Sequence, residues 1–431
     1  MTLEIQLDEK NEFTAGDLVK GNVVLESNKD QAVGRVRIIF YGRAKTMINR
    51  HQQNTPPMVT RCMLFEITKD LFIGSYTLRR GRYEWPFQFE FPMYSQPGME
   101  ERFINGGVYA GADVAVPLPP TFSANHTGLE QTSITDVEYK LKATVTRPPD
   151  APFLRQLTNM ESKLSVKYFP GRLEESPNLC LQALPSSFNA KSLHLLPHRS
   201  HDKLTIKEKL RSTFKSSELP NVDFIVELRY PTQIYPGGPF PITLALTKMQ
   251  KSDDVEDDPP VMIKSVSVNV VAQAQCRTKG MILPEHTGYI TLRADVVKTP
   301  GKSLNIELPP LNSKAVQAGT ESGEVDITKL GKLSCLSKRI SNDFRVHNIL
   351  LQHELRVKVK LTCAQKQFEI RMEKPLRVLP ALYRGPTRMR PMSAEQSSWQ
   401  VEPNSGEETA LESSELPAYE GRPPQYELAC Q

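Results

Sequence analysis

The chain has 431 residues, of which 24% are charged, and its formal net charge is +5. This length is enough for two or three domains with substantial buried cores. The small positive balance does not resemble a dedicated nucleic-acid binder, whose basic residues usually dominate one face. It still allows a local basic patch to contact an acidic membrane surface.

The N-terminus and the cysteines indicate a reducing compartment. Met1–Asp8 has neither a basic region nor an apolar one, so we expect no signal peptide. No stretch has the roughly 18 apolar residues that are needed to span a bilayer. The six cysteines are scattered without a Cys-x-x-Cys pair, which is typical of free thiols. The sequence therefore predicts a cytoplasmic protein.

Alternation of apolar and polar residues dominates the N-terminal part of the chain. Leu3–Leu7, Val36–Phe40 and Val137–Val145 are three runs with this period of two, and Leu164–Phe169 is a further expected strand. Such runs, separated by Gly, Pro and Asn clusters, are typical of half-buried antiparallel strands. They predict a β-sandwich lobe over residues 1–170.

An aromatic row lies within Gly81–Pro92 of this lobe. One side of the expected strand carries Tyr83, Trp85, Phe87, Phe89 and Phe91. A row of this kind is more often the core of a sandwich than a platform for a ligand. Pro86 interrupts the row, which indicates an edge position or the entry of a strand.

The pattern then starts again in the same order. Three segments have counterparts: Phe13–Leu25 with Ile234–Leu246, Val36–Gly42 with Val266–Ala272, and Glu138–Val145 with His353–Lys360. Recurrence in one order indicates two homologous sandwiches in tandem. Helical periodicity is nearly absent and proline is frequent, at 34 residues, as in β-sandwich proteins. We therefore predict an all-β fold of two tandem antiparallel β-sandwich lobes, the second over residues 221–380.

A polar and basic connector is expected between the lobes, over residues 171–220. Within it, Arg199–Lys215 is rich in cations. As a helix, this segment would place Ile206, Leu210 and Phe214 on one stripe beside lysines, as in segments that contact acidic lipid. We favour the alternative, a flexible basic linker. The candidate lipid-contacting residues are Arg199, Lys203, Lys207, Lys209, Arg211 and Lys215.

The sequence carries only weak signals of catalysis and of metal binding. The sequence has no Gly-x-Ser-x-Gly motif, no phosphate-binding glycine loop and no His-Glu-x-x-His motif. His194, His198 and His201 have helical spacing, but Pro197 interrupts that helix. The acidic run Asp253–Asp258 lacks the glycine-punctuated spacing of a calcium loop. We expect no enzyme, no metal and no cofactor.

The order of these elements resembles the α-arrestin family, the arrestin-related trafficking adaptors. The matching features are the opening strand, Ala15–Asp17 followed by Gly21, Gly81–Pro92, Val137–Val145 and Tyr230–Gly237. The resemblance covers about residues 1–380 plus the tail and is carried by dispersed motifs. It implies an arrestin N-like and an arrestin C-like sandwich that are linked through a polar interface. It also implies recruitment of HECT-type ubiquitin ligases to plasma-membrane transporters and receptors.

Residues 381–431 have the composition of a disordered tail. They are rich in Ser, Glu and Pro and contain no lysine, because Lys374 is the last lysine of the chain. If a bound ligase modifies the adaptor itself, the acceptor lysine must therefore lie upstream of the tail.

The tail contains one sharp motif, Pro-Pro-Gln-Tyr, and a degenerate copy, Leu-Pro-Ala-Tyr. Two prolines fix φ and preform a polyproline II turn, so less entropy is lost on binding. WW domains bind such segments in an aromatic groove. The predicted WW-binding residues are Pro423, Pro424 and Tyr426, and in the second copy Leu416, Pro417 and Tyr419.

These observations predict an adaptor that recruits a WW-domain HECT-type ubiquitin ligase to membrane transporters or receptors and promotes their ubiquitination and endocytosis. We expect it in the cytoplasm, with recruitment to the plasma membrane or endosomes. The alternative is an arrestin-like coat or cargo-sorting component, similar to a retromer subunit, that acts without a ligase. A third class, a lipid-binding scaffold, would use the basic connector.

Overall fold

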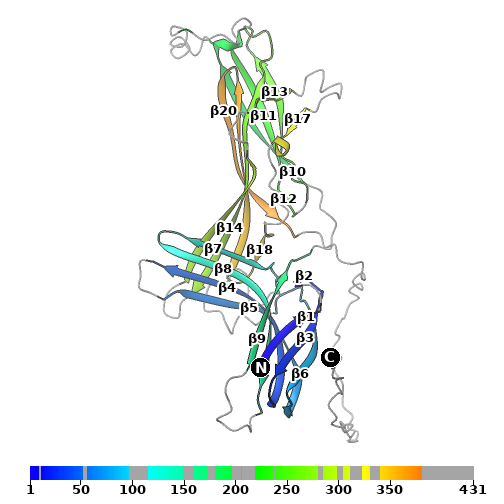
Figure 1. Cartoon of the computed structure of the whole chain (residues 1–431). Coiled ribbons are helices and arrows are strands. Elements are labelled where there is room, and N and C mark those ends of the chain that lie inside the picture. Colours follow the sequence, from blue (N-terminus) through cyan, green and yellow to red (C-terminus); the bar gives the residue numbers. More distant parts are fainter. Residues whose placement is uncertain are drawn as a thin grey trace, which may run out of the picture. The chain divides into compact units, whose positions relative to one another are not determined.

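The regular secondary structure of the described residues consists almost entirely of β-strands (Figure 1). The computed structural model describes residues 1–8, 11–51, 56–96, 115–148, 160–171, 180–196, 205, 219–236, 238–279, 285–298, 304–310, 323–330 and 340–380. Within these ranges the helical elements are two 3₁₀ turns, Leu193–Leu195 and Ile327–Leu330. No helix in this part of the chain is long and apolar enough to cross a membrane.

The first lobe contains two sheets, whose strands are mostly antiparallel. One sheet has the order β1-β3-β6 and the other the order β2-β9-β8-β4-β5, with β7 paired to β8. The bounds are β1 Thr2–Leu7, β2 Glu12–Phe13, β3 Leu18–Ser27, β4 Gln31–Arg50, β5 Met58–Leu78, β6 Gly81–Glu90, β7 Phe122–Thr127, β8 Gln131–Thr146 and β9 Met160–Tyr168. The predicted edge position of Pro86 is confirmed, because β6 ends the three-stranded sheet.

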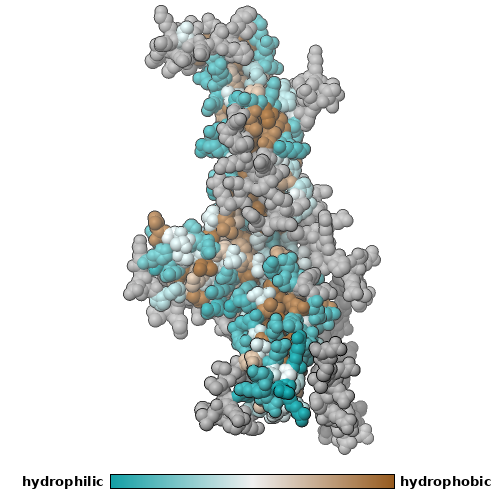
Figure 2. Space-filling model, viewed as in Figure 1, coloured by the Kyte–Doolittle hydropathy of each residue, from teal (hydrophilic) through white to brown (hydrophobic). Residues whose placement is uncertain are grey.

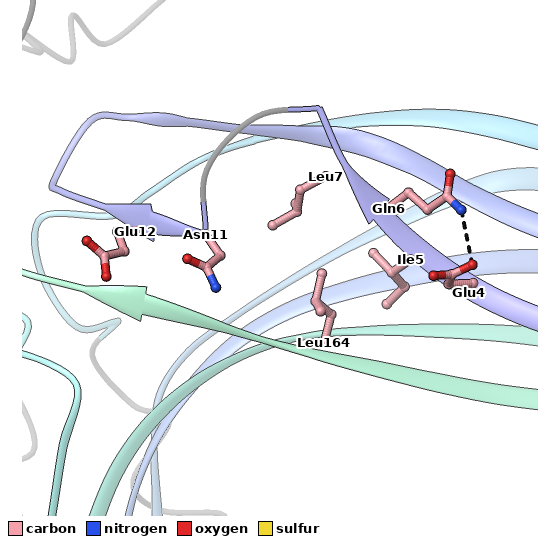
Figure 3. A pocket seen from close by; sticks show the side chains of 7 residues that line it. All are labelled: Glu4, Ile5, Gln6, Leu7, Asn11, Glu12 and Leu164. Carbon is pink, nitrogen blue, oxygen red and sulfur yellow. Dashed lines mark hydrogen bonds between the residues drawn. The ribbon is translucent and has the colours of Figure 1, made fainter.

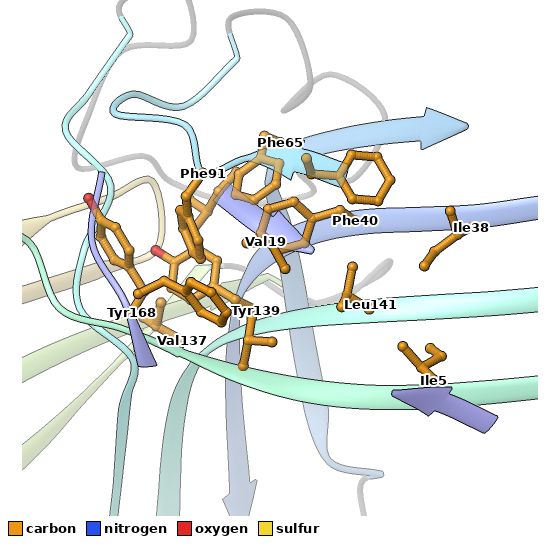
Figure 4. Packing of buried hydrophobic residues seen from close by; sticks show 14 of the residues in the cluster. Ile5, Val19, Ile38, Phe40, Phe65, Phe91, Val137, Tyr139, Leu141 and Tyr168 are labelled. Carbon is orange, nitrogen blue, oxygen red and sulfur yellow. The ribbon is translucent and has the colours of Figure 1, made fainter. Parts of the chain in front are cut away.

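Aromatic side chains fill the core of the first lobe (Figure 4). Phe91 stacks on Tyr168 with ring centroids 4.5 Å apart and packs edge-on against Tyr139 at 5.2 Å. Tyr139 is fully buried, and its hydroxyl donates a hydrogen bond of 2.5 Å to the Pro119 carbonyl. Phe87 and Phe89 are buried in the same cluster. The predicted role of the aromatic row as sandwich core is therefore confirmed.

The second lobe repeats this plan. Its sheets have the orders β10-β11-β13-β17 and β12-β20-β19-β14-β15, with β16 on β14 and β18 on β19. The bounds are β10 Leu181–Lys191, β11 Asn221–Pro231, β12 Gln233–Ile234, β13 Thr243–Lys251, β14 Val261–Lys279, β15 Glu285–Lys298, β16 Ile306–Glu307, β17 Glu324–Asp326, β18 Phe344–Arg345, β19 Ile349–Cys363 and β20 Lys366–Val378. A separate apolar cluster forms its core.

The pairing of the strands confirms two sandwiches of the same topology. In the first lobe the short strand β2 runs parallel to the end of β9, and in the second β12 runs parallel to the end of β20. Likewise β4 lies between β5 and β8, as β14 lies between β15 and β19. The segments that recur in the sequence therefore occupy equivalent places in the two lobes.

The structure corrects the predicted connector in one part. Residues 181–191 form β10, which pairs with β11 along its whole length, so the second lobe takes up a strand upstream of residue 221. The inward positions of β10 include Leu184, Phe188 and Ala190, with Ser186 between them. This alternation is weak in the sequence, because Pro185 and two serines interrupt the apolar series.

Candidate functional site: an inter-lobe layer and a charged sheet face

The site residues predicted from the sequence lie outside the described ranges. This holds for both tail motifs, with Pro423, Pro424, Tyr426, Leu416, Pro417 and Tyr419, and for the basic segment with Arg199, Lys203, Lys207, Lys209, Arg211 and Lys215. Their roles stay predictions. The structure does describe the strand that precedes the tail: after β20, the Leu379 amide donates to the Ile234 carbonyl at 2.8 Å.

Two regions of the described chain combine buried or clustered polar groups, and the first lies between the lobes. Both lobes belong to one compact unit, Met1–Arg384. The C-terminal half of β4 and the N-terminal half of β8 pack against the C-terminal half of β14 and the N-terminal half of β15. We call this region the inter-lobe layer and define it by Thr46, Ile48, Met58, Ser133, Thr135, Ala274, Cys276, Thr278, Gly288 and Asn348.

A short chain of hydrogen bonds crosses the inter-lobe layer. The Thr46 hydroxyl donates to the Arg277 carbonyl at 2.8 Å. Asn348 donates from Nδ2 to the Thr46 hydroxyl at 3.1 Å and to the Ala44 carbonyl at 3.4 Å. The Arg277 amide in turn donates to the Asn348 carbonyl at 3.0 Å. Because Thr46 and Ala44 belong to the first lobe and the other two residues to the second, these bonds fix the register between the lobes.

Gly288 allows a close approach of the two lobes. A Cβ atom at this position would lie 2.6 Å from the Ser133 hydroxyl, 2.8 Å from the Cys276 sulfur and 3.1 Å from Ile48 Cδ1. The Cys276 thiol is buried at this contact. Burial raises its pKa to about 11, although hydrogen bonds with the Gly288 backbone and Ser133 oppose the shift. The thiol is therefore protonated and unreactive while the layer stays closed.

Several polar atoms of the inter-lobe layer have no partner. Within the described part of the chain, the hydroxyls of Thr135 and Thr278 and the Oδ1 atom of Asn348 are buried without a hydrogen bond. An unsatisfied buried polar group costs about 1–3 kcal/mol. The layer is therefore less stable than its burial alone suggests.

The second region is the outer face of the sheet that contains β4, β5, β8 and β9. Three carboxylates on this face each lie between two cations. Asp70 pairs with Arg37 at 2.7 Å and Arg35 at 3.7 Å, Glu138 pairs with Arg43 and Lys140, and Glu161 pairs with Lys142 at 2.7 Å and with Lys163. These six cations exceed the three carboxylates by three charges. Such a face attracts acidic surfaces.

The ion pairs shift the carboxyl groups in one direction. Burial raises the pKa of Glu138, but hydrogen bonds from Lys140 and Arg43 outweigh it and hold the pKa below its ordinary value. Hydrogen bonds from Lys142 and Lys163 likewise lower the pKa of Glu161. The carboxylates are thus charged at neutral pH, and the face is a set of ion pairs with positive excess.

The two regions consist of ion pairs, buried hydroxyl groups and a buried thiol. Among the described residues, no group of three or more His, Cys, Asp or Glu side chains could hold a metal ion. The charged face and the inter-lobe layer were not predicted individually from the sequence; only a polar interface between the lobes was expected, from the family resemblance. The usable signal was the continued alternation beyond Phe40, at Ala44, Thr46 and Ile48.

The comparison with known proteins identifies the first lobe. Residues 3–166 match the arrestin (or S-antigen) N-terminal domain family, and this range runs from β1 into β9. The first lobe is therefore similar in sequence to arrestin N-terminal domains. A search of curated protein sequences found no significant match to the chain.

Proposed function

We propose that this protein is a non-enzymatic adaptor that brings a WW-domain HECT-type ubiquitin ligase to plasma-membrane transporters or receptors. The arrestin N-terminal domain supports an adaptor or trafficking role, because arrestins serve as adaptors. The observation that carries the finer proposal is the Pro-Pro-Gln-Tyr motif at Pro423–Tyr426, near the end of a segment that contains no lysine.

We assign separate roles to the lobes and to the tail on the basis of their composition. The lobes supply rigid sheet surfaces for the cytosolic parts of a membrane protein. The tail supplies the ligand for the ligase, since its preformed proline turn loses little entropy on binding. The positive excess on the charged face favours a position close to the anionic cytoplasmic leaflet, where each nearby cation contributes about 1 kcal/mol.

The second motif serves as a weaker docking point. Tyr419 and Tyr426 are seven positions apart (426 − 419), at most roughly 25 Å in an extended chain. This separation barely accommodates two small domains side by side. Rapid rebinding of one ligase to the two motifs can still raise the apparent affinity, because tethering gives local concentrations of about 1 mM.

Titration of the full-length chain with WW domains tests ligase docking. We expect Tyr426→Ala to weaken binding at least tenfold, or about 1.4 kcal/mol, and Tyr419→Ala to have a smaller effect. Pro403→Ala is the matched control, since it removes a tail proline outside both motifs. Equal losses from the two tyrosine variants, or unchanged binding, would contradict the proposal.

A cellular experiment separates an adaptor from a coat component. In cells that express wild type or Tyr426→Ala, co-purification should recover ligase and transporter together with the first and transporter alone with the second. Deletion of residues 414–431 should abolish ubiquitination of the cargo. Sorting that continues normally after this deletion would favour an arrestin-like coat component and would refute the ligase role.

A further inference from the structure

Two cations lie opposite each other on the charged face, the outer side of the sheet that contains β4, β5, β8 and β9. Lys45 on β4 pairs across the strands with Arg61 on β5. Ala44 and Cys62 beside them are buried on the inner side, so both charged side chains point outward. Neither cation forms an ion pair with a residue that the structure describes. Like charges directly opposite each other in a sheet are destabilising.

The strand on the other side of Lys45 does not neutralise this charge. The residue opposite Lys45 on β8 is Asp136. Its carboxylate accepts a hydrogen bond of 2.7 Å from the Ser123 hydroxyl on β7 and forms no ion pair with Lys45. Arg61 is exposed and Lys45 is half-buried. The charge of both side chains is therefore available to an anion.

Ion pairs around a carboxylate are common to the two lobes. On equivalent strands, β8 and β9 in the first lobe and β19 and β20 in the second, a glutamate lies between a cation two positions further on and a cation of the neighbouring strand. These clusters are Glu161 with Lys163 and Lys142, and Glu369 with Arg371 and Lys358. A pattern that both lobes repeat belongs to the fold, so these ion pairs alone indicate no ligand.

The two opposed cations, by contrast, are not repeated in the second lobe. The offset between the recurring segments of β4 and β14 is 230 (266 − 36), so the equivalent of Lys45 is Gln275. Gln275 lies opposite Tyr289 on β15, the strand equivalent to β5. The fold therefore accepts neutral side chains at this place. Since the two positive charges weaken the sheet and the fold does not need them, they indicate a binding role.

The two sheets of the first lobe carry charges of opposite sign. In Figure 2 the surface over β1, β3 and β6 is mostly hydrophilic. The charged residues of these three strands are four glutamates and two cations: Glu4, Glu26, Glu84 and Glu90, with Lys20 and Arg82. An acidic sheet on one side and a positive excess on the other orient the lobe in the field of an anionic surface.

We propose that the charged face, including Lys45 and Arg61, binds the phosphate groups of anionic lipids in the cytoplasmic leaflet. Its cations extend along β4 from Arg35 to Lys45, ten residues (45 − 35) or about 33 Å of strand, and lie on four neighbouring strands. Charges that are spread over such an area match the many separate headgroups of a membrane, whereas one acidic peptide would need them along a single line.

The other side of the sheet stays free for the second lobe. Thr46, the neighbour of Lys45, points inward and bonds to the Arg277 carbonyl in the inter-lobe layer. Lipid contact at Lys45 therefore leaves the docking of the lobes intact. This inference deepens the proposed function, on which it rests for the location beside a membrane.

Co-sedimentation of the full-length protein with vesicles tests the site. The probes are vesicles of phosphatidylcholine alone and vesicles with about 30% phosphatidylserine. We expect binding to the anionic vesicles alone, and loss of binding when salt rises from about 0.1 M to about 0.5 M. Lys45→Ala/Arg61→Ala should weaken binding at least tenfold, because each cation close to an anionic leaflet contributes about fivefold.

The matched control is Lys20→Ala/Arg82→Ala, which removes one lysine and one arginine from the opposite sheet and should leave binding unchanged. Lys45→Arg/Arg61→Lys keeps both charges and should retain binding. Lys45→Ala/Arg61→Ala should melt no lower than the wild type, since it removes a repulsion. Equal binding of neutral vesicles, equal losses from the two alanine variants, or unchanged binding of Lys45→Ala/Arg61→Ala would each overturn the proposal.

Two soluble probes distinguish the source of the negative charge. The first is inorganic phosphate at the concentration of the lipid phosphate, and the second is a short fluorescein-labelled polyglutamate peptide, read by anisotropy. We expect neither to displace the protein from anionic vesicles. Displacement by phosphate would make the face a site for a free anion. Tighter binding of the peptide than of the vesicles, lost in Lys45→Ala/Arg61→Ala, would make it a site for an acidic protein segment. Either result would overturn the lipid site.

Two variants separate this inference from ligase docking. Tyr426→Ala should abolish WW-domain binding and leave vesicle binding unchanged, whereas Lys45→Ala/Arg61→Ala should do the reverse. If neither tail tyrosine matters but the charged face still binds vesicles, the proposed function fails and the lipid site stands. If WW domains bind and vesicles do not, the lipid site fails alone.

Discussion

Strand β4 contributes to both the core of the first lobe and the inter-lobe layer, with large apolar side chains in the core and smaller or polar ones in the layer. In its first half, β4 points Val36, Ile38 and Phe40 into an aromatic core, and all three are fully buried. In its second half the same face presents Ala44, Thr46 and Ile48 to the second lobe. Large rings that interdigitate lose many contacts when they move, whereas small and polar groups lose few. The aromatic core therefore stabilises the fold of the first lobe, whereas the inter-lobe layer sets how the two lobes dock on each other.

Truncation of a core ring should have the largest effect. Phe91 is fully buried and touches Phe40, Tyr139 and Tyr168 with centroid distances of 4.5–5.2 Å. Phe91→Ala should lower the free energy of unfolding of the first lobe by about 3–5 kcal/mol. Urea unfolding followed by the fluorescence of Trp85 measures it, in a Trp399→Phe background so that the first lobe alone reports. A loss no greater than that of Tyr289→Ala, on an exposed side chain, would contradict this interpretation of the core.

A small intrusion into the inter-lobe layer should have an intermediate effect. Gly288→Ala places a methyl group 2.6 Å from the Ser133 hydroxyl and should cost about 1–3 kcal/mol of lobe docking. The readout is the rate at which a thiol reagent labels Cys276 relative to Cys363, since burial raises the pKa of both thiols to about 11. We expect labelling of Cys276 to accelerate at least tenfold, with Cys363 unchanged.

The matched control for this experiment is Gly128→Ala. A Cβ atom there lies at ordinary contact distances, 3.5 Å or more from its neighbours, so neither thiol should react faster. If Gly288→Ala accelerates both thiols alike, the substitution loosens the second lobe itself and the layer is not an independent region.

The charged face should contribute least. Removal of the Glu138 carboxylate leaves Arg43 and Lys140 to repel each other, at a cost below about 1 kcal/mol. The folded-state pKa of Glu138 lies below its ordinary 4.5, so its stabilisation is complete above that value and disappears as the pH falls through the folded pKa. Glu138→Gln should therefore be destabilising at pH 7 and neutral well below pH 4.5. A difference in melting temperature that is independent of pH would refute the role of the carboxylate charge.

The same contrast explains which parts of the fold could be predicted. Strands such as β4 and β8 were visible because their inward residues are large and apolar. β10 was missed because Pro185 and Ser186 weaken its alternation, and its strand character depends on pairing with β11. The inter-lobe layer could not be predicted for a similar reason. Thr135 and Thr278 are buried there, although threonine is more often found at the surface.

The tail motif could be identified from the sequence without any knowledge of the fold. A short linear motif is recognised from its residues alone, because the binding to a WW domain that we propose for Pro423, Pro424 and Tyr426 requires no fold around them. The groove between β1 and β9, which Leu7 and Leu164 line, is the opposite case (Figure 3). Leu7 and Leu164 are distant in the sequence, and only the sheet order brings the two side chains together.

Strand β14 links the two lobes through its phase. Val266, Val268 and Val270 fill the core of the second lobe, and Ala274, Cys276 and Thr278 face the first lobe from the same side of the strand. Since side chains alternate with a period of two, inserting or deleting one residue in the middle of β14 would expel one set or the other. The length of β14 is therefore constrained by both lobes together. A change in the length of the segments before or after β14 would leave both sets of side chains in place.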